Sequence, residues 1–243
     1  MTYFDNNATT PLDPLAEQVW LEASREFWHN PSSPYRAAAR AHNKLNEARE
    51  RLARIVDCQP EELVFNSGAT EGNNTIFQYF QRTEPDTQVA VSAIEHPCVL
   101  DAARACFPNK CDVLRVNAQG VVDLDALEAR LQAGGVSLVS VMAANNETGV
   151  VQPWPAIVKL CRRYGNPVHL DAAQWIGKRT AAGMGKADFL TGCAHKFGGP
   201  KGVGFLKLNE DYGDFHCFLG GGQEGGHRPG TENLPAILAM VAI

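Results

Sequence analysis

The sequence contains no segment that would direct the chain into a membrane or a secretory route. Residues 1–14 do not combine a basic region with an apolar stretch, so we expect no signal peptide. No apolar run approaches the roughly 20 residues that a membrane-spanning helix needs. These two absences predict a cytoplasmic protein without a membrane partner.

Paired cysteine motifs and basic clusters are absent as well. The seven cysteines are odd in number and include no C-x-x-C pair, which favours reduced thiols over a disulfide framework or a metal site. The chain has 22 Lys and Arg against 27 Asp and Glu, a net charge of −5, and no basic block. Nucleic acid is therefore not an expected partner, because its phosphates bind clustered Lys and Arg.

The 243 residues do contain an alternation of helical and strand-like patterns. Apolar residues recur at three- and four-residue steps over residues 36–56, as on one face of a helix. Further helices are expected over residues 69–81, 124–131 and 154–164, in the segment that begins at Pro97, and in the apolar run over residues 234–243. Strands are expected over residues 62–66, 88–93, 111–116, 137–143, 168–170 and 202–208. Strands that alternate with helices predict an α/β fold with a largely parallel sheet covered on both faces.

Four polar clusters directly follow expected strands. They are Ser67-Gly68-Ala69-Thr70, Glu95-His96, Asn145-Asn146-Glu147 and Asp171-Ala172-Ala173-Gln174. Ligands of parallel sheets bind beyond the carboxyl ends of the strands, so we expect the clusters to converge on one site. Any one of them could be a simple turn, but four in equivalent places favour a site.

Lys196 lies in a glycine-rich loop, and Asp171 ends an apolar strand. A lysine with a lowered pKa can form an imine with an aldehyde, although a surface lysine is the simpler interpretation of the loop alone. A buried carboxylate needs a partner, and a pyridinium nitrogen is a suitable one. Gln174 could then bond the phenolic oxygen of the same ring. The alternative for Asp171 is an N-cap of a following helix.

The segment from Ser67 to Thr70 offers a site for a phosphate group. Backbone N–H groups at a helix N-terminus, with a hydroxyl beside them, bind anions. His96 could lie on a flat cofactor and transfer protons, although a lone histidine is more often structural. The G-x-G-x-x-G match that begins at Gly220 opens no obvious helix and is interpreted as incidental. The combination predicts a pyridoxal 5'-phosphate site.

The ordered motifs of the chain resemble the cysteine desulfurases of the class V aminotransferase group, in the branch that serves iron–sulfur cluster assembly and nitrogen fixation. The resemblance runs from Asp5 to about Asn233, through Asp5-Asn6-Asn7-Ala8-Thr9-Thr10, Gly68-Ala69-Thr70-Glu71, Glu95-His96, Asn145-Asn146-Glu147-Thr148-Gly149, His169-Leu170-Asp171-Ala172-Ala173-Gln174, His195-Lys196, Gly220-Gly221-Gly222-Gln223-Glu224 and Arg228-Pro229-Gly230-Thr231-Glu232-Asn233. It implies a type I pyridoxal-phosphate transferase fold. Residues 15–243 would be the large domain, with a mostly parallel seven-stranded sheet, and residues 1–14 would associate with a small domain.

The resemblance implies a role for each matching residue. Lys196 would bind the cofactor as a Schiff base and move protons, and His96 would stack on the ring as a second acid/base group. The implied cofactor-binding residues are Ala69, Thr70, His96, Asp171, Gln174, Cys193, His195, Lys196 and Thr231. Asn146 would lie near the substrate carboxylate. Thr231 would reach the phosphate of a neighbouring subunit, which implies a homodimer.

The implied reaction converts L-cysteine to L-alanine and passes the sulfur, through an enzyme persulfide, to an acceptor or iron–sulfur scaffold protein. Cys193 departs from the family, which usually has a phosphate-binding serine there. Nothing matches the persulfide cysteine or the substrate-binding arginine of the C-terminal small domain, which we expect to be absent. Cys98 or Cys193 could replace the nucleophile. Another class V lyase, for selenocysteine or cystine, and a non-catalytic cofactor-binding fragment are the alternatives.

Overall fold

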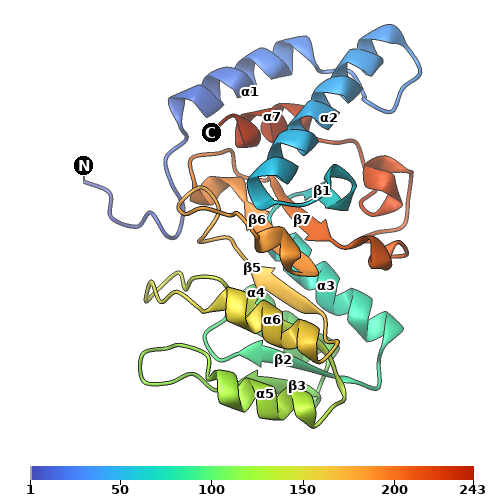
Figure 1. Ribbon diagram of the computed structural model, residues 1–243. Helices are drawn as coiled ribbons and strands as arrows, with labels where there is room; N and C mark the ends of the chain where they lie inside the picture. Colours follow the sequence, from blue (N-terminus) through green and yellow to red (C-terminus); the bar gives the residue numbers. More distant parts are fainter. Residues whose placement is uncertain (1) are drawn as a thin grey trace.

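A seven-stranded sheet forms the middle layer of the structure, a computed structural model that describes residues 2–243 (Figure 1). The strands are β1 (Leu63–Asn66), β2 (Gln88–Ser92), β3 (Cys111–Leu114), β4 (Val136–Met142), β5 (Val168–Asp171), β6 (Phe189–Cys193) and β7 (Gly204–Leu208). Their order is β1-β7-β6-β5-β4-β2-β3, and β7 runs antiparallel to both of its neighbours while the other pairs are parallel. The predicted α/β fold with a mostly parallel sheet is confirmed.

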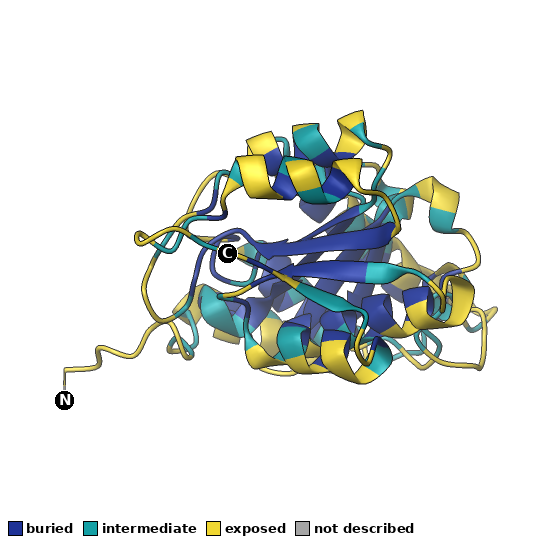
Figure 2. Ribbon diagram, turned by 90° about the horizontal axis from the view of Figure 1, so that it is seen from below, coloured by how far each residue is buried: buried dark blue, intermediate teal, exposed yellow. Residues whose placement is uncertain are grey.

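Helices cover both faces of this sheet (Figure 2). The described α-helices are α1 (Pro14–Glu26), α2 (Arg36–Val56), α3 (Ala69–Thr83), α4 (Pro97–Cys106), α5 (Leu124–Gln132), α6 (Trp154–Arg163) and α7 (Leu234–Ala242). One apolar core lies between the sheet and α2, α5, α6 and α7, and a second lies between the opposite face and α3 and α4. Helix α1 packs along α7. None of the described helices is both long and apolar enough to cross a membrane.

The alternation of side chains along the strands supplies both cores. In β1, Leu63 and Phe65 belong to the first core and Val64 to the second, since successive strand residues point to opposite faces. Every residue of β4, β5, β6 and β7 is buried, as expected for strands covered on both sides. Helix α2 buries the predicted stripe through Leu45 and Leu52 against the first core.

Two elements of the structure have no counterpart among the predicted ones. Strand β6 includes Gly192, which weakens the strand pattern, yet it pairs with β5 and β7 and is central to the sheet. Helix α1 buries only the small residues Ala16 and Ala23, so it has no strong apolar stripe. Tertiary pairing and packing, rather than local pattern, stabilise both elements.

A buried ion pair fastens α2 to the loop that precedes α7. The guanidinium of Arg49 donates to the Glu224 carboxylate at 2.9 and 2.7 Å, and the backbone N–H of Phe65 donates to the same carboxylate at 2.7 Å. The Glu224 side chain is only 1% exposed. Truncation of the arginine would therefore leave an unpaired charge in the interior.

We expect Arg49→Ala to lower the free energy of unfolding by roughly 3 kcal/mol, because removing one member of a buried ion pair leaves the other charge buried without a partner. Urea unfolding at neutral pH measures the loss. Lys44→Ala is the matched control on the same helix, since Lys44 pairs with Glu47 in solvent; its cost is expected to stay below about 1 kcal/mol. Equal losses in the two variants would contradict the importance assigned to the buried pair.

Candidate active site

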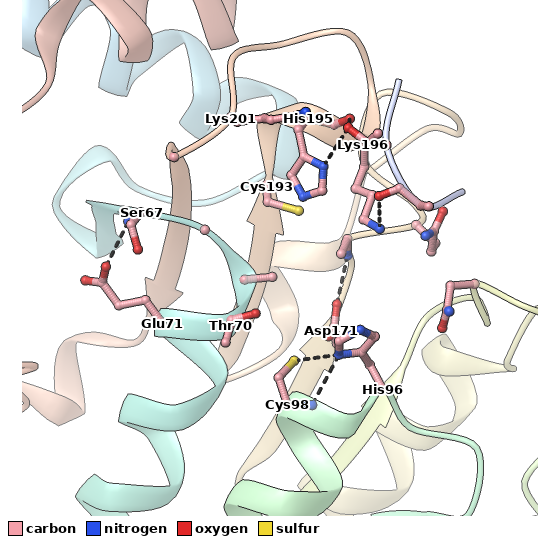
Figure 3. A pocket seen from close by; sticks show the side chains of 18 of the residues that line it. Ser67, Thr70, Glu71, His96, Cys98, Asp171, Cys193, His195, Lys196 and Lys201 are labelled. Carbon is pink, nitrogen blue, oxygen red and sulfur yellow. Dashed lines mark hydrogen bonds between the residues drawn. The ribbon is translucent and has the colours of Figure 1, made fainter. Parts of the chain in front are cut away.

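A cavity of about 560 Å³ opens beyond the carboxyl ends of the parallel strands (Figure 3). Nine of the ten predicted site residues line it, namely Ala69, Thr70, His96, Asn146, Asp171, Gln174, Cys193, His195 and Lys196. The tenth, Thr231, lies in a separate hollow beside Ser67 and Arg228. The four polar clusters therefore converge on one cavity, as the sequence predicts. No group of three or more His, Cys, Asp or Glu side chains within residues 2–243 is arranged to hold a metal ion.

Asp171 is a buried carboxylate in the wall of this cavity. It ends β5 and is 4% exposed. Asn73 Nδ2 donates to Oδ2 at 2.8 Å and the Ala173 N–H donates to Oδ1 at 2.9 Å, but within the described chain no lysine, arginine or histidine forms a salt bridge with it. Burial raises the pKa of Asp171, and these hydrogen bonds together with the charges of His96 and Lys196 oppose the rise. A cationic ligand group would complete this environment.

Residues after Asp171 form turns rather than the helix that an N-cap would require. The bond from the Ala173 N–H closes a tight local turn on the Asp171 side chain. The alternative interpretation of Asp171 as a helix cap therefore does not apply. Its carboxylate is left facing the cavity with one neutral donor on each oxygen.

Lys196 approaches the cavity from the short helical turn after β6. Its Nζ donates to the backbone carbonyls of Asn7 at 2.7 Å and Ala8 at 2.8 Å. Gln174 contacts the same N-terminal segment, because its Nε2 donates to the Asn7 carbonyl at 2.7 Å while its Oε1 accepts from Lys178 at 2.6 Å. The N-terminal segment around Asn7 therefore forms part of the cavity wall. The local sequence pattern does not place this segment beside Lys196 or Gln174.

His96 caps helix α4 and faces the cavity at the same time. Its Nδ1 accepts a hydrogen bond from the Cys98 backbone N–H at 3.2 Å, and the Cys98 Sγ lies 3.0 Å from the same nitrogen (Figure 3). Since Nδ1 accepts from the backbone, the proton of the neutral ring is on Nε2. The structural and the functional interpretations of this histidine are therefore compatible.

The N-terminus of α3 lies at one end of the cavity, in the geometry that suits an anion. The first turn of a helix leaves backbone N–H groups without intrahelical partners, and here Ala69, Thr70 and Glu71 line the cavity. Lys201, which the sequence does not single out, also lines the cavity. A side chain at Gly204 would place its Cβ 2.6 Å from the Gly68 Cα, so this glycine allows β7 to approach the start of α3.

Two cysteine thiols, Cys98 and Cys193, also line the cavity. Burial raises the pKa of Cys193 to about 12, and burial likewise raises the pKa of Cys98, with Asp171 adding to both effects. Attack on sulfur requires a thiolate. The environment keeps both thiols protonated near neutral pH, which disfavours either of them as a replacement nucleophile.

Asn73 is a site residue that the sequence analysis does not identify. It is completely buried on α3, on the helix face that carries Ala69, Ile76 and Phe80. A polar residue at a core position of an amphipathic helix is the signal that could have revealed it, since a buried amide needs partners. Its partner Asp171 lies 98 residues away in sequence.

Glu95 is a second buried carboxyl group close to the site. The Ser92 hydroxyl and the Met142 N–H donate to its Oε1, whereas its Oε2 has no hydrogen-bond partner among the described residues. Burial raises the pKa of Glu95 to about 8, far above its ordinary value of 4.5. The folded chain therefore holds this proton more tightly than the unfolded chain does.

Stability is accordingly expected to depend on the proton of Glu95. The contribution of this proton to the stability of the folded chain is fully present below about pH 4.5 and is lost as the pH rises to about 8. Glu95→Gln, which cannot ionise, should flatten this decline, as measured by urea unfolding across that pH range. Glu50→Gln, at an exposed position of α2, is the control and should keep the wild-type slope. A wild-type slope in Glu95→Gln would contradict the assignment.

Known proteins resemble this chain over nearly its whole length. Residues 2–238 match the aminotransferase class-V family. A cysteine desulfurase from Nostoc sp. is 36% identical over 246 residues, covering 98% of this chain and 60% of the relative. A selenocysteine lyase from Bos taurus is 36% identical over 277 residues, covering 98% of this chain and 62% of the relative.

The solved structure of a NifS-like protein superposes with a TM-score of 0.92 at 35% identity, covering 99% of this chain and 67% of that protein. The chain spans about 60% of the length of the curated relatives that it matches. The matched region includes every strand of the sheet and all residues that line the cavity. The chain belongs to the aminotransferase class-V family.

Proposed function

We propose that this chain provides the cofactor site of a pyridoxal-phosphate-dependent cysteine desulfurase, which converts L-cysteine to L-alanine and transfers the sulfur. The observation that carries the proposal is the buried Asp171 carboxylate, which lacks a cationic partner and shares a cavity with an amine and a helix N-terminus. Pyridoxal phosphate has the three matching groups, a basic ring nitrogen, an aldehyde and a phosphate. The similarity to cysteine desulfurases supports the choice of reaction.

The residues of the cavity fit this cofactor. Asp171 would pair with the ring nitrogen and Gln174 would bond the phenolic oxygen. The phosphate would lie at the N-terminus of α3, with Ala69, Thr70, Cys193 and His195. Burial, with the charges of Lys196 and Lys201, lowers the pKa of His195, so its neutral ring would act as a hydrogen-bond partner rather than as a cation.

When bound, pyridoxal phosphate supplies an electron-withdrawing ring that accepts the electron pair released at the substrate carbon. Lys196 would hold the cofactor covalently and would take a proton from the substrate Cα and return one to the product. His96 would exchange a proton through Nε2, since Nδ1 is occupied by the Cys98 N–H. Asn146 would bind the substrate carboxylate, and Asn7 Nδ2 fixes the backbone there by donating to the Asn146 carbonyl at 3.0 Å.

The proposal extends to the assembly. Thr231 lies outside the cavity, which fits a role at the phosphate of a second subunit in a homodimer. The Arg228–Glu71 ion pair, at 2.9 Å, links the segment that carries Thr231 to the first turn of α3. We further propose that residues 15–243 act as a large domain, that residues 1–14 associate with a small domain, and that an acceptor or iron–sulfur scaffold protein receives the sulfur.

The experiment has two stages. Purified protein with added pyridoxal phosphate should show the visible absorbance of a lysine-bound cofactor; no such absorbance would reject the cofactor proposal. Alanine and sulfide are then measured with L-cysteine and, in parallel, alanine and selenide with L-selenocysteine. A preference for selenocysteine would replace the desulfurase by the lyase that the Bos taurus relative represents. Cofactor binding without turnover of either substrate would reject catalysis by this chain.

A further inference from the structure

Next to Asp171, buried polar side chains form a line that runs from one strand of the sheet to the next. Ser140 Oγ lies 2.8 Å from His169 Nδ1, and His169 Nε2 lies 3.1 Å from Thr191 Oγ1. Thr191 Oγ1 donates to Asn73 Oδ1 at 2.7 Å, and Asn73 Nδ2 donates to Asp171 Oδ2 at 2.8 Å. We call Ser140, His169, Thr191 and Asn73 the polar chain. All four side chains are completely buried.

The fold places the polar chain on one face of the sheet. Ser140 on β4 is the register partner of His169 on β5, and Thr191 on β6 is the register partner of Asp171. Helix α3 adds Asn73 from the layer above. A Cβ on Gly72 would lie 2.9 Å from Thr191 Cγ2, so this glycine allows the helix to approach β6 closely enough for the amide to reach the hydroxyl.

The direction of every hydrogen bond in the polar chain follows from proton counting. The Thr191 hydroxyl has one proton and donates it to Asn73 Oδ1, so it must accept from His169 Nε2–H. Burial lowers the pKa of His169 to about 3, so its ring is neutral and Nδ1 has no proton. Nδ1 therefore accepts from the Ser140 hydroxyl. Every bond donates toward Asp171.

The opposite direction is incompatible with a charged Asp171. If the chain reversed, Asn73 would turn its amide oxygen toward the carboxylate, and Asp171 would have to carry a proton to donate to it. The reversed amide would also lose the bond from Asn73 Nδ2 to Cys98 Sγ at 3.2 Å. An ionised Asp171 therefore requires the observed direction.

We propose that the polar chain is a positioning device that holds Asp171 as a carboxylate, oriented to receive a cationic ring nitrogen in the cavity. Its members touch neither cofactor nor substrate and act through the Asn73 amide. The proposal rests on the proposed function only for the identity of the cation, since the direction of the hydrogen bonds is a property of the chain itself. It makes residues from three adjacent strands contributors to the cofactor site.

Other ionisable groups face Asp171 and act on its charge as well. They are His96 and Cys98 from α4, Glu95 from the loop before it, and Cys193 and Lys196 from the end of β6 and the turn that follows. The charges of His96 and Lys196 favour the charged carboxylate, and Glu95 opposes it once Glu95 itself ionises, at about pH 8. The polar chain differs from them in being neutral, so its effect should persist where these groups are screened or titrated.

The test uses the cofactor-free chain with isotopic labels, which separates it from the proposed function. Carbon NMR follows the Asp171 carboxyl group in wild type, Thr191→Val and Thr191→Ser. Valine keeps the shape but removes the hydroxyl, whereas serine retains it. We expect the pKa of Asp171 to rise by about 1 in Thr191→Val, a tenfold change in its ionisation constant, and to return to the wild-type value in Thr191→Ser. An equal pKa in all three would overturn the proposal.

Nitrogen NMR of the His169 ring provides the second readout. We expect the proton on Nε2 in wild type from about pH 5 to about pH 8, and also in Ser140→Ala, because the Thr191 hydroxyl still has to accept from Nε2–H there. Ser140→Ala removes only the outermost donor and serves if Thr191→Val does not fold. A proton on Nδ1 in wild type would also overturn the proposal. Failure of the protein to bind pyridoxal phosphate would instead count against the proposed function and would leave both NMR results standing.

Discussion

Lys196→Ala is expected to abolish covalent attachment of pyridoxal phosphate and to lower turnover by about 10³-fold or more, since one residue would lose both its nucleophilic and its proton-transfer role. Treatment of the wild type with borohydride should fix the cofactor to the peptide that contains Lys196, as seen by mass spectrometry. The variant should show neither the fixed cofactor nor the visible absorbance of a lysine-bound form.

The chain offers a matched control for this result. Lys201 lines the same cavity, and its charge acts on His195, one of the residues proposed to hold the phosphate. Lys201→Ala should keep the covalent attachment and weaken binding only through the phosphate. If borohydride instead fixes the cofactor in Lys196→Ala and not in Lys201→Ala, the assignment of the two lysines is reversed.

Asp171→Asn is expected to change cofactor binding and stability in opposite directions. The amide cannot pair with a ring cation, so we expect the dissociation constant for pyridoxal phosphate to rise roughly 10²-fold, as for loss of a charged hydrogen bond. Turnover should fall as well, because the ring nitrogen would lose the partner that keeps it protonated. Fluorescence titration with the cofactor and steady-state assays measure these two effects.

The cofactor-free variant should in contrast be more stable than wild type. Burial raises the pKa of Asp171, so the folded chain binds this proton more tightly than the unfolded chain. The stability that follows is present below the ordinary pKa and is lost as the pH rises through the folded one, which leaves an unfavourable buried charge at neutral pH. Removing that charge should gain about 1 kcal/mol in urea unfolding.

Asp101→Asn, at an exposed position of α4, serves as the control and should change neither property. A variant at position 171 that lost stability and kept its affinity would show that the carboxylate serves folding rather than the cofactor. Loss of both would show that the fold needs the ionised form. Each of these patterns contradicts the expected gain in stability with loss of affinity.

Much of the site could be predicted from the sequence because its parts are local motifs at predictable places. A polar cluster that follows a strand of a parallel sheet must lie at the carboxyl edge of that sheet, whichever neighbour the strand has. For this reason Thr70, His96 and Asp171 were expected together and do line one cavity. Lys196 was joined to them by its chemistry and by the family resemblance, because the strand that precedes it was not predicted. The order and spacing of the motifs also sufficed to indicate the family, which the match over residues 2–238 shows.

The tertiary structure decided what surrounds those motifs. Asn73 and Thr191 look like an ordinary helix residue and a residue of a weak strand, and they meet only because β6 enters the sheet beside β5 and Gly72 lets α3 pack closely on it. The carbonyls of Asn7 and Ala8 reach Lys196 from almost 190 positions away in the chain. A sequence fixes which groups can donate or accept, whereas the direction of a buried hydrogen bond depends on partners that long-range packing selects.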